Sequence, residues 1–404
     1  MRAFFVNLGV LAAALAVGAI LVEVLARAFF GLPAPYALPA ESTVFDARGF
    51  WTGVPGFTAR FDNRVDFRDA AVGIDDIGAR RVPCAADAGT AMAPVRVFLV
   101  GDSQTFGWGL SDADTWANGL QCRLETAAPG RYRVINFGVA GTQVDQYWAR
   151  GVRQVVPGIR PGDVVVVSVT WNDLVTFNDG LPFVEQVLAQ AGLRRDGSGV
   201  RQVEPPPPVA GDGQGLALRL LEPRRYLNPP TWRYRFYNDY GVFVPSFDSP
   251  KAFADTMTYV SAAFGILWRH ARLLYYRLRP ADSLAAKLEP HVFEYNFLTL
   301  KALQTVMRRR GARMLVQLLP NRLFFDDFYY AAYSKNGVVF PARDFMGSIA
   351  ADLCPKLELD CVNRFDDLAT AARDAHTFPF DGHYNAAGAA RVASALAREV
   401  RTAP

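Results

Sequence analysis

The sequence predicts an α/β protein built on a parallel sheet, because short apolar runs alternate with segments of helical spacing. Runs rich in Val, Leu and Ile suit strands that are buried on both faces. They occupy residues 96–100, 133–137, 163–170 and 313–319, and the sheet is expected to continue at 359–365. Helical spacing between the first three runs, at 116–124 and 143–156, and a last helix at 386–400 complete the pattern. Such alternation predicts a layered domain with right-handed crossovers.

Length and composition bound the class of protein. A chain of 404 residues, 51% hydrophobic and 20% charged, is large enough to bury a core in one large domain with an insertion, or in two domains. The formal net charge of +4 is spread without a dense Lys/Arg block, so no nucleic-acid partner is expected. The sequence contains no metal-ligand cluster, phosphate loop or dinucleotide fingerprint, and we expect no metal and no cofactor.

The N-terminus predicts a membrane anchor over residues 1–30. Between residues 3 and 22 only Asn7 and two glycines interrupt the apolar character, and about 20 such residues span a bilayer as a helix. A cleaved signal peptide is the alternative, but its apolar region is shorter and ends in a small-residue site. The balance of Arg2 against Arg27 favours an exported domain, periplasmic or extracellular.

The rest of the chain divides into segments that differ in composition and in apolar periodicity. Residues 31–94 are predicted to be a linker and an irregular, β-containing lead-in, and residues 95–404 the α/β domain, with a helical and irregular insertion at about 177–289. An apolar stripe within 252–279 is flanked by arginines. Such a basic amphipathic helix either packs on its own domain or lies on an anionic membrane.

Four cysteines suit an exported protein. Cys354 and Cys361 are close in sequence, and Cys84 and Cys122 form a second candidate pair. Connectivity cannot be deduced from sequence, and four free thiols remain the alternative.

The candidate nucleophile is Ser103, in the stretch GDSQTFG that ends the first predicted strand of the domain. Ligands of open α/β sheets bind beyond the carboxyl ends of the strands, so Ser103 stands where a site is expected. A serine hydroxyl needs a base within hydrogen-bond reach and donors for the oxyanion. A strand-to-helix turn without chemistry would use the same residue types.

Suitable partners end other predicted elements. Gly141 follows the second strand and Asn172 the third, offering a backbone N–H and a side-chain amide. Asp381 and His383 lie in a loop just before the last helix. Asp374 and His376 have the same spacing as that pair, but Asn385 can cap the last helix directly after His383, which favours His383.

These blocks, in this order, resemble the SGNH hydrolase superfamily, the GDSL-type esterases and lipases. The resemblance implies a flavodoxin-like α/β/α sandwich and cleavage of an ester without a cofactor. It implies that Ser103 attacks the carbonyl, that His383 is the base and that Asp381 orients it. The oxyanion hole would be formed by the N–H groups of Ser103 and Gly141 and by the amide of Asn172.

Two departures bear on the substrate. The spacing Asp-x-His replaces the commoner Asp-x-x-His, and Trp171 stands where many members have glycine. The expected partner is therefore only an ester-bearing small molecule, lipid or glycan. The alternatives to a hydrolase are an acyltransferase or acetylesterase acting on a cell-surface polysaccharide, and a non-catalytic binding module that keeps the fold.

Overall fold

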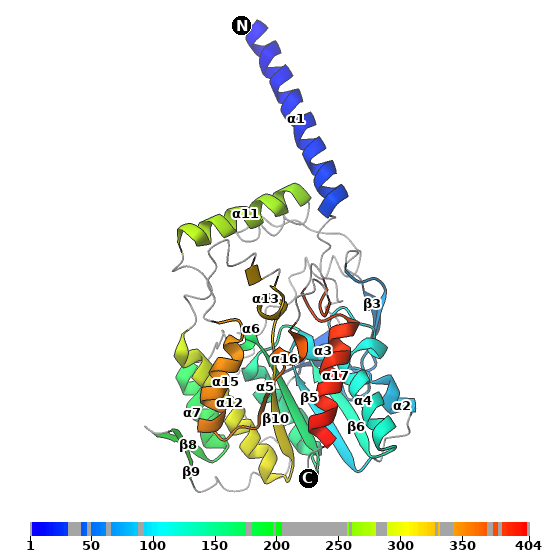
Figure 1. Ribbon diagram of the computed structural model, residues 1–404, viewed down its shortest axis with the longest axis vertical. Helices are drawn as coiled ribbons and strands as arrows, with labels where there is room; N and C mark the ends of the chain where they lie inside the picture. Colours follow the sequence, from blue (N-terminus) through cyan, green and yellow to red (C-terminus); the bar gives the residue numbers. More distant parts are fainter. Residues whose placement is uncertain are drawn as a thin grey trace.

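The structure is a computed structural model. It describes residues 2–30, 42–46, 50–61, 66–87, 93–174, 180–196, 199–203, 257, 261–279, 289–327, 330–331, 342–369, 375–378 and 382–401 (Figure 1). The expected elements are present with small shifts of their ends, and the predicted α/β class is confirmed.

The centre of the domain is a five-stranded, wholly parallel sheet in the order β11-β10-β7-β5-β6. The strands are β5 (Val95–Gly101), β6 (Tyr132–Gly138), β7 (Val164–Thr170), β10 (Arg313–Leu319) and β11 (Cys361–Asn363). Numbered by their order in the chain, the five strands lie in the sheet as 2-1-3-4-5, as in flavodoxin-like folds. The direction in which strands are added to the sheet therefore changes between β5 and β7. The fold therefore predicts a ligand site beyond the carboxyl ends of β5 and β7.

Helices cover both faces of the sheet and give three layers. On one face lie α5 (Val144–Arg150), α7 (Gly180–Gln190), α12 (Pro290–Arg309) and α15 (Phe345–Lys356), whose apolar side chains share a core with Phe98 and Val165. On the other face α4 (Trp116–Ala127) and α17 (Ala386–Arg401) share a second core with Leu99 and Val166. Successive residues of one strand enter different cores, which is why these strands are apolar throughout.

The segment expected as a helix over 143–156 changes its winding partway. After α5, residues Gly151–Val155 form a π-turn and Val156–Gly158 a 3₁₀ turn. A Cβ atom on Gly151 would lie 2.7 Å from Cδ1 of Leu303 in α12. The glycine thus lets the two helices approach closely at the point where the winding changes.

The lead-in packs on the sheet domain. Its described strands form two antiparallel hairpins, β1 (Thr43–Asp46) with β2 (Phe50–Gly53) and β3 (Thr58–Phe61) with β4 (Ala70–Gly73). Phe50 belongs to one core and Ile74 to the other. A short helix, α2 (Pro83–Asp87), then leads toward β5.

Both cysteine pairs are joined. The Cys84–Cys122 disulfide ties α2 to α4, and the Cys354–Cys361 disulfide ties α15 to β11. Of the alternatives that the sequence left open, the structure therefore has the two pairs Cys84–Cys122 and Cys354–Cys361.

The N-terminal helix α1 (Arg2–Phe30) projects from the domain (Figure 1). Its stretch Phe4–Phe29 has a mean hydropathy of 2.5 and is long and apolar enough to cross a membrane, a test that signal sequences also pass. Within the predicted insertion, the described residues form α7, a hairpin of β8 (Leu193–Asp196) and β9 (Gly199–Gln202), and α11 (Ala262–Leu278). The remainder of the insertion lies outside the described residues.

Candidate active site

Ser103 opens the one-turn helix α3 (Ser103–Phe106), directly after β5. The carboxylate of Asp102 caps this turn by accepting from the Gln104 N–H at 2.9 Å. Gly107 ends the turn with φ +86°, a left-handed conformation that favours glycine. The Gly-Asp-Ser start and the glycine end of the motif thus form a short capped turn that holds the Ser103 hydroxyl at the sheet edge.

Two glycines allow this turn to lie tightly against the sheet. A Cβ on Gly138, the last residue of β6, would lie 2.3 Å from the backbone nitrogen of Phe106, and one on Gly101 would lie 2.0 Å from Oγ1 of Thr105. The first clash is with main chain, which cannot rotate away. These positions therefore require glycine for space rather than for backbone conformation.

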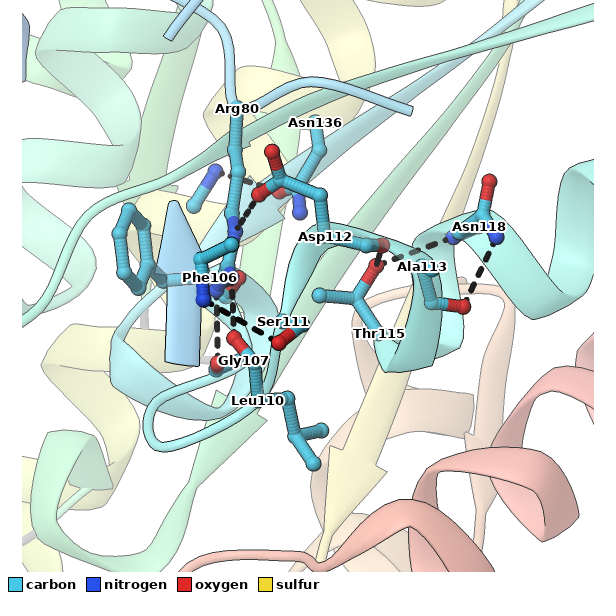
Figure 2. Close-up of polar contacts among 12 residues, drawn as sticks. Arg80, Phe106, Gly107, Leu110, Ser111, Asp112, Ala113, Thr115, Asn118 and Asn136 are labelled. Atoms are coloured by element: carbon cyan, nitrogen blue, oxygen red, sulfur yellow. Dashed lines mark hydrogen bonds and ion pairs between the residues drawn. The ribbon is translucent and has the colours of Figure 1, made fainter. Parts of the chain in front are cut away.

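A buried arginine of the lead-in holds the far end of the turn (Figure 2). Arg80, 1% exposed, donates at 2.6 Å to the carbonyl oxygens of both Phe106 and Gly107 and also donates to Leu110 O. Its Nε lies 2.9 Å from the carboxylate of Asp112. Burial lowers the pKa of Arg80, but the Asp112 carboxylate beside it opposes that shift. Arg80 was not predicted as a site residue, because nothing in its local sequence indicates that it contacts the turn.

A second buried guanidinium holds the other side. Arg150 of α5 donates to Phe137 O at 2.8 Å and to Gly101 O at 3.2 Å, at the carboxyl ends of β6 and β5. Burial lowers its pKa to about 10. The turn that carries Ser103 thus lies between two buried arginines, one that donates to carbonyls of the turn and one that donates to carbonyls at the strand ends.

His383 lies against the nucleophile candidate: its Nε2 is 2.8 Å from Oγ of Ser103. His376, the competing histidine, is buried, and its Nδ1 lies 2.9 Å from the carbonyl oxygen of Leu368. The Asn385 side chain accepts from Gly388 N at 3.0 Å and so caps α17, as the sequence predicted. Of the two histidines, only His383 meets Ser103.

The loop that carries His383 is fastened directly to the nucleophile turn. The Oε1 atom of Gln104 accepts from the backbone N–H of Tyr384 at 3.2 Å, and the Tyr384 hydroxyl donates to Pro320 O at 2.6 Å. Phe378 N donates to His383 O at 2.8 Å, which closes the loop on itself. Gln104 and Tyr384 are neighbours of the motif residues in sequence, and that adjacency was the only signal that could have found them.

The other predicted site residues are placed as follows. Asp381 lies outside the described residues. Gly141 has φ +75°, and a Cβ there would meet no atom within 4 Å. Asn172, in α6 (Trp171–Leu174), is exposed, and its Oδ1 accepts from the hydroxyl of Thr170 at 2.8 Å. Ser103 and Asn172 thus both follow the carboxyl ends of neighbouring strands, where the fold predicts a site.

Beneath Ser103 two buried carboxyl groups share one hydroxyl. Oγ1 of Thr170 lies 2.9 Å from Oδ2 of Asp102 and 3.0 Å from Oδ2 of Asp173, and both aspartates are at most 2% exposed. A hydroxyl has one proton and can donate to only one of these two carboxyl oxygens or to Oδ1 of Asn172, which is also within reach. The second carboxyl group satisfies Thr170 without repulsion if it keeps its own proton and donates.

The surroundings assign that proton to Asp173. Burial raises the pKa of Asp173 well above its ordinary value, and the charge of Asp102 adds to the increase. Burial also raises the pKa of Asp102, but the Gln104 N–H and the charge of His383 oppose it. Asp173 also accepts from Thr170 N at 2.7 Å and closes the first turn of α6, the capping role that its sequence position favours. Hydrogen bonds from Thr170 and Tyr147 oppose the increase at Asp173, but its pKa is the more strongly raised of the two, so we expect the proton on Asp173.

The described site offers a hydroxyl, an imidazole and unpaired N–H groups at one sheet edge. Ser103 is the first residue of α3, so its own N–H has no acceptor within that helix. The described residues contain no group of three His, Cys, Asp or Glu that could hold a metal ion. What remains is a nucleophile, a base and hydrogen-bond donors, which suits attack on a carbonyl.

Comparison with known proteins agrees with this chemistry. Residues 99–239 match the model of the GDSL-like lipase/acylhydrolase family, a span that includes Ser103, Gly141 and Asn172 and ends before His383. No curated protein matches the chain in sequence.

Solved structures that resemble the chain include three from bacteria. An acetylxylan esterase from Geobacillus stearothermophilus shares 11% identity with a TM-score of 0.34 and covers 76% of this chain and 94% of its own. An aryl esterase from M. smegmatis shares 10% identity with a TM-score of 0.34, and the match covers 76% of this chain and 98% of the esterase. A lipolytic G-D-S-L protein from Veillonella parvula shares 11% identity with a TM-score of 0.34, and the match covers 77% of this chain and 100% of that protein.

Fold and site together define an α/β/α hydrolase that acts on ester bonds. Residues 99–239 of the chain are therefore similar to the GDSL-like lipase/acylhydrolase family, the resemblance that its motifs predicted.

Proposed function

We propose that the protein is a membrane-anchored serine esterase that hydrolyses an acyl or acetyl ester outside the cytoplasm. Ser103 is the nucleophile, His383 the general base and Asp381 the residue that orients the imidazole. The observation that carries the proposal is the 2.8 Å separation between Nε2 of His383 and Oγ of Ser103. That is hydrogen-bond reach for proton transfer in a resting enzyme.

The reaction follows from this geometry. His383 accepts the proton of the Ser103 hydroxyl as the oxygen attacks the ester carbonyl, and it then donates that proton to the leaving alcohol. Water, activated by the same imidazole, releases the acid and regenerates Ser103. The N–H groups of Ser103 and Gly141 and the Asn172 amide stabilise the oxyanion, and loss of one such donor raises the barrier by about 3–4 kcal/mol.

Two features support a location outside the cytoplasm. Both cysteine pairs are joined as disulfides, which persist in oxidising compartments. The apolar stretch Phe4–Phe29 is long enough to anchor the chain. Carbonate extraction of membranes should leave the full-length protein in the pellet, and recovery of a soluble form that begins after residue 20 would show a cleaved signal instead.

A fluorophosphonate probe tests the nucleophile. It should label Ser103, and Ser103→Ala should lose both labelling and cleavage of a soluble ester. His383→Ala should lower turnover by about 10³-fold or more, because mainly oxyanion and binding contributions then remain. His376→Gln, the control, should lose far less. A well-folded Ser103→Ala protein with full activity would refute the proposal, and the opposite behaviour of the two histidine variants would refute the assignment of the base.

A further inference from the structure

The amphipathic helix α11 is fastened to the membrane anchor. The carboxylate of Glu23, in the last third of α1, accepts from the Ser261 hydroxyl at 2.7 Å and from the N–H groups of Ala262 and Ala263 at 3.0 and 3.1 Å. It therefore binds the unpaired donors that open α11. As a result α11 lies across the domain-side end of α1 (Figure 1).

One face of α11 is apolar and uncovered. Its exposed large side chains are Leu267, Trp268, Leu274, Tyr275 and Leu278, with exposed fractions from 44% to 73%. The spacing i, i+1, i+7, i+8, i+11 places all of them on a single helical stripe. The alternative that this stripe packs on its own domain is therefore not what the structure shows. A continuous exposed apolar stripe marks an interaction surface.

The bilayer is the occupant that this surface fits. About 20 helical residues span the hydrocarbon core of a bilayer, so a membrane that begins near Phe4 ends near Glu23, the level at which α11 begins. Trp and Tyr beside Leu are typical of the boundary between headgroups and acyl chains. The helix contains three arginines and no acidic residue, which suits anionic headgroups.

The catalytic edge faces the same side as α11. The short helices α6 and α13 (Arg322–Phe325), which follow the carboxyl ends of β7 and β10, lie at the end of the domain that points toward α11 (Figure 1). Because the strands are parallel, the end of β5 with Ser103 belongs to that edge too. A membrane at the level of α11 therefore lies above the site rather than behind the domain.

We propose that α11 lies in the plane of the membrane boundary with its Leu267–Leu278 face among the lipids, and that it presents the Ser103 edge to esters carried by membrane lipids. The identity of the substrate rests on the proposed esterase function, but the position of α11 does not. The proposal thus names an interaction surface, its partner and a substrate class.

Trp268 reports on the membrane contact. The full-length protein is reconstituted in vesicles of phosphatidylcholine and phosphatidylglycerol, with and without bromine on the acyl chains. The emission that Trp268→Phe removes from the wild type should be strongly quenched by the brominated lipid. Equal emission in both vesicles would overturn the proposal. So would protection of Trp268 that depends on protein concentration, since a second copy of the chain would then cover the face.

Charges on the stripe test the substrate class. Leu274→Glu combined with Leu278→Glu alters only exposed side chains, and we expect about tenfold slower hydrolysis of a vesicle-borne phospholipid ester, with cleavage of a soluble ester unchanged. Ile77→Glu is the matched control, because Ile77 is 52% exposed but lies in the lead-in. Equal loss on both esters, or no loss, would overturn the substrate class. A wild type that cleaves neither ester refutes the esterase function, and quenching of Trp268 then still decides the placement of α11.

Discussion

The Ser103 turn and the His383 loop meet within 2.8 Å, but they are held in different ways. The turn is built from the interior: it continues a central strand, lies against glycines and is gripped by buried arginines. The loop is held by side chains: hydrogen bonds join it to Gln104, Pro320 and Arg322, and the side chains of Phe378 and Tyr384 pack in the second core. The nucleophile is thus carried by main chain that continues the central sheet, whereas the position of the base depends on side-chain hydrogen bonds and on the packing of its loop.

Arg80→Met should show the largest effect on the turn. It removes the donors of Phe106 O, Gly107 O and Leu110 O and leaves Asp112 without its partner, at a cost of about 4 kcal/mol in the free energy of unfolding. Chemical denaturation measures this directly. Arg60→Met is the matched control, because Arg60 pairs with Asp69 on the exposed surface of the same lead-in and should change stability little. Equal losses in the two variants would contradict the role of Arg80 as a clamp.

Gly138→Ala tests the close approach of the turn. The new methyl group would lie 2.3 Å from the Phe106 nitrogen, so the turn must move, with a loss of about 3 kcal/mol in stability and a displaced Ser103. Labelling by a fluorophosphonate should fall with it. Gly158→Ala, at an exposed position with no atom within 4 Å, should be neutral. A Gly138→Ala protein that labels at the normal rate would show that the turn tolerates displacement.

The sequence predicted the strand ends and the residues that form this site, but not the buried side chains that hold them in place. Strand ends could be read because apolar runs stop at Ser103 and Asn172, and the choice of His383 over His376 followed from the cap at Asn385. Arg80 is 26 residues from Phe106 in sequence, and only the folded chain brings them together.

The same limit applies to the helical elements. The stripe of α11 was visible in sequence, but whether protein covers a stripe is a property of the tertiary structure. Gly151, where the winding changes after α5, lies against Leu303, a residue of another helix. Periodicity therefore predicted the local secondary structure. Contacts between distant segments determine which helix faces are covered and how closely the helices pack.

Gln104→Met removes the acceptor of the Tyr384 N–H, a hydrogen bond that joins the two regions beside the Ser103–His383 contact. We expect turnover of a soluble ester to fall about tenfold with a loss of about 1 kcal/mol in stability, because His383 loses its alignment while the core stays intact. Gln121→Met is the control: Gln121 is buried and binds Tyr132 O and Val134 N, away from the site. It should lose similar stability and keep its turnover per folded molecule. Equal turnover in both variants would show that the loop does not need Gln104.

The smallest expected effect comes from the buried carboxyl group of Asp173 beneath the Ser103 turn. The test is the sign of its contribution to the pH dependence of stability. Asp173 has a raised pKa, so the folded state holds a proton that the unfolded state releases above about pH 4. Its contribution to stability is therefore full at low pH and decreases as the pH rises toward the folded-state value. Asp173→Asn removes this dependence: relative to the wild type it should gain stability as the pH rises from 4 to 8 and gain nothing below pH 4.

A spectroscopic measurement and a control complete this test. The infrared band of a protonated buried carboxyl group should be present in the wild type at pH 7 and absent in Asp173→Asn. Asp163→Asn should behave oppositely in unfolding experiments, because the buried Asp163 carboxylate binds Arg96 and its replacement costs stability at neutral pH. If Asp173→Asn also loses stability at pH 7 and the band persists, the proton belongs to Asp102. Ser103 would then stand above a neutral carboxyl group, and the charge under the nucleophile turn would lie one strand further along the sheet.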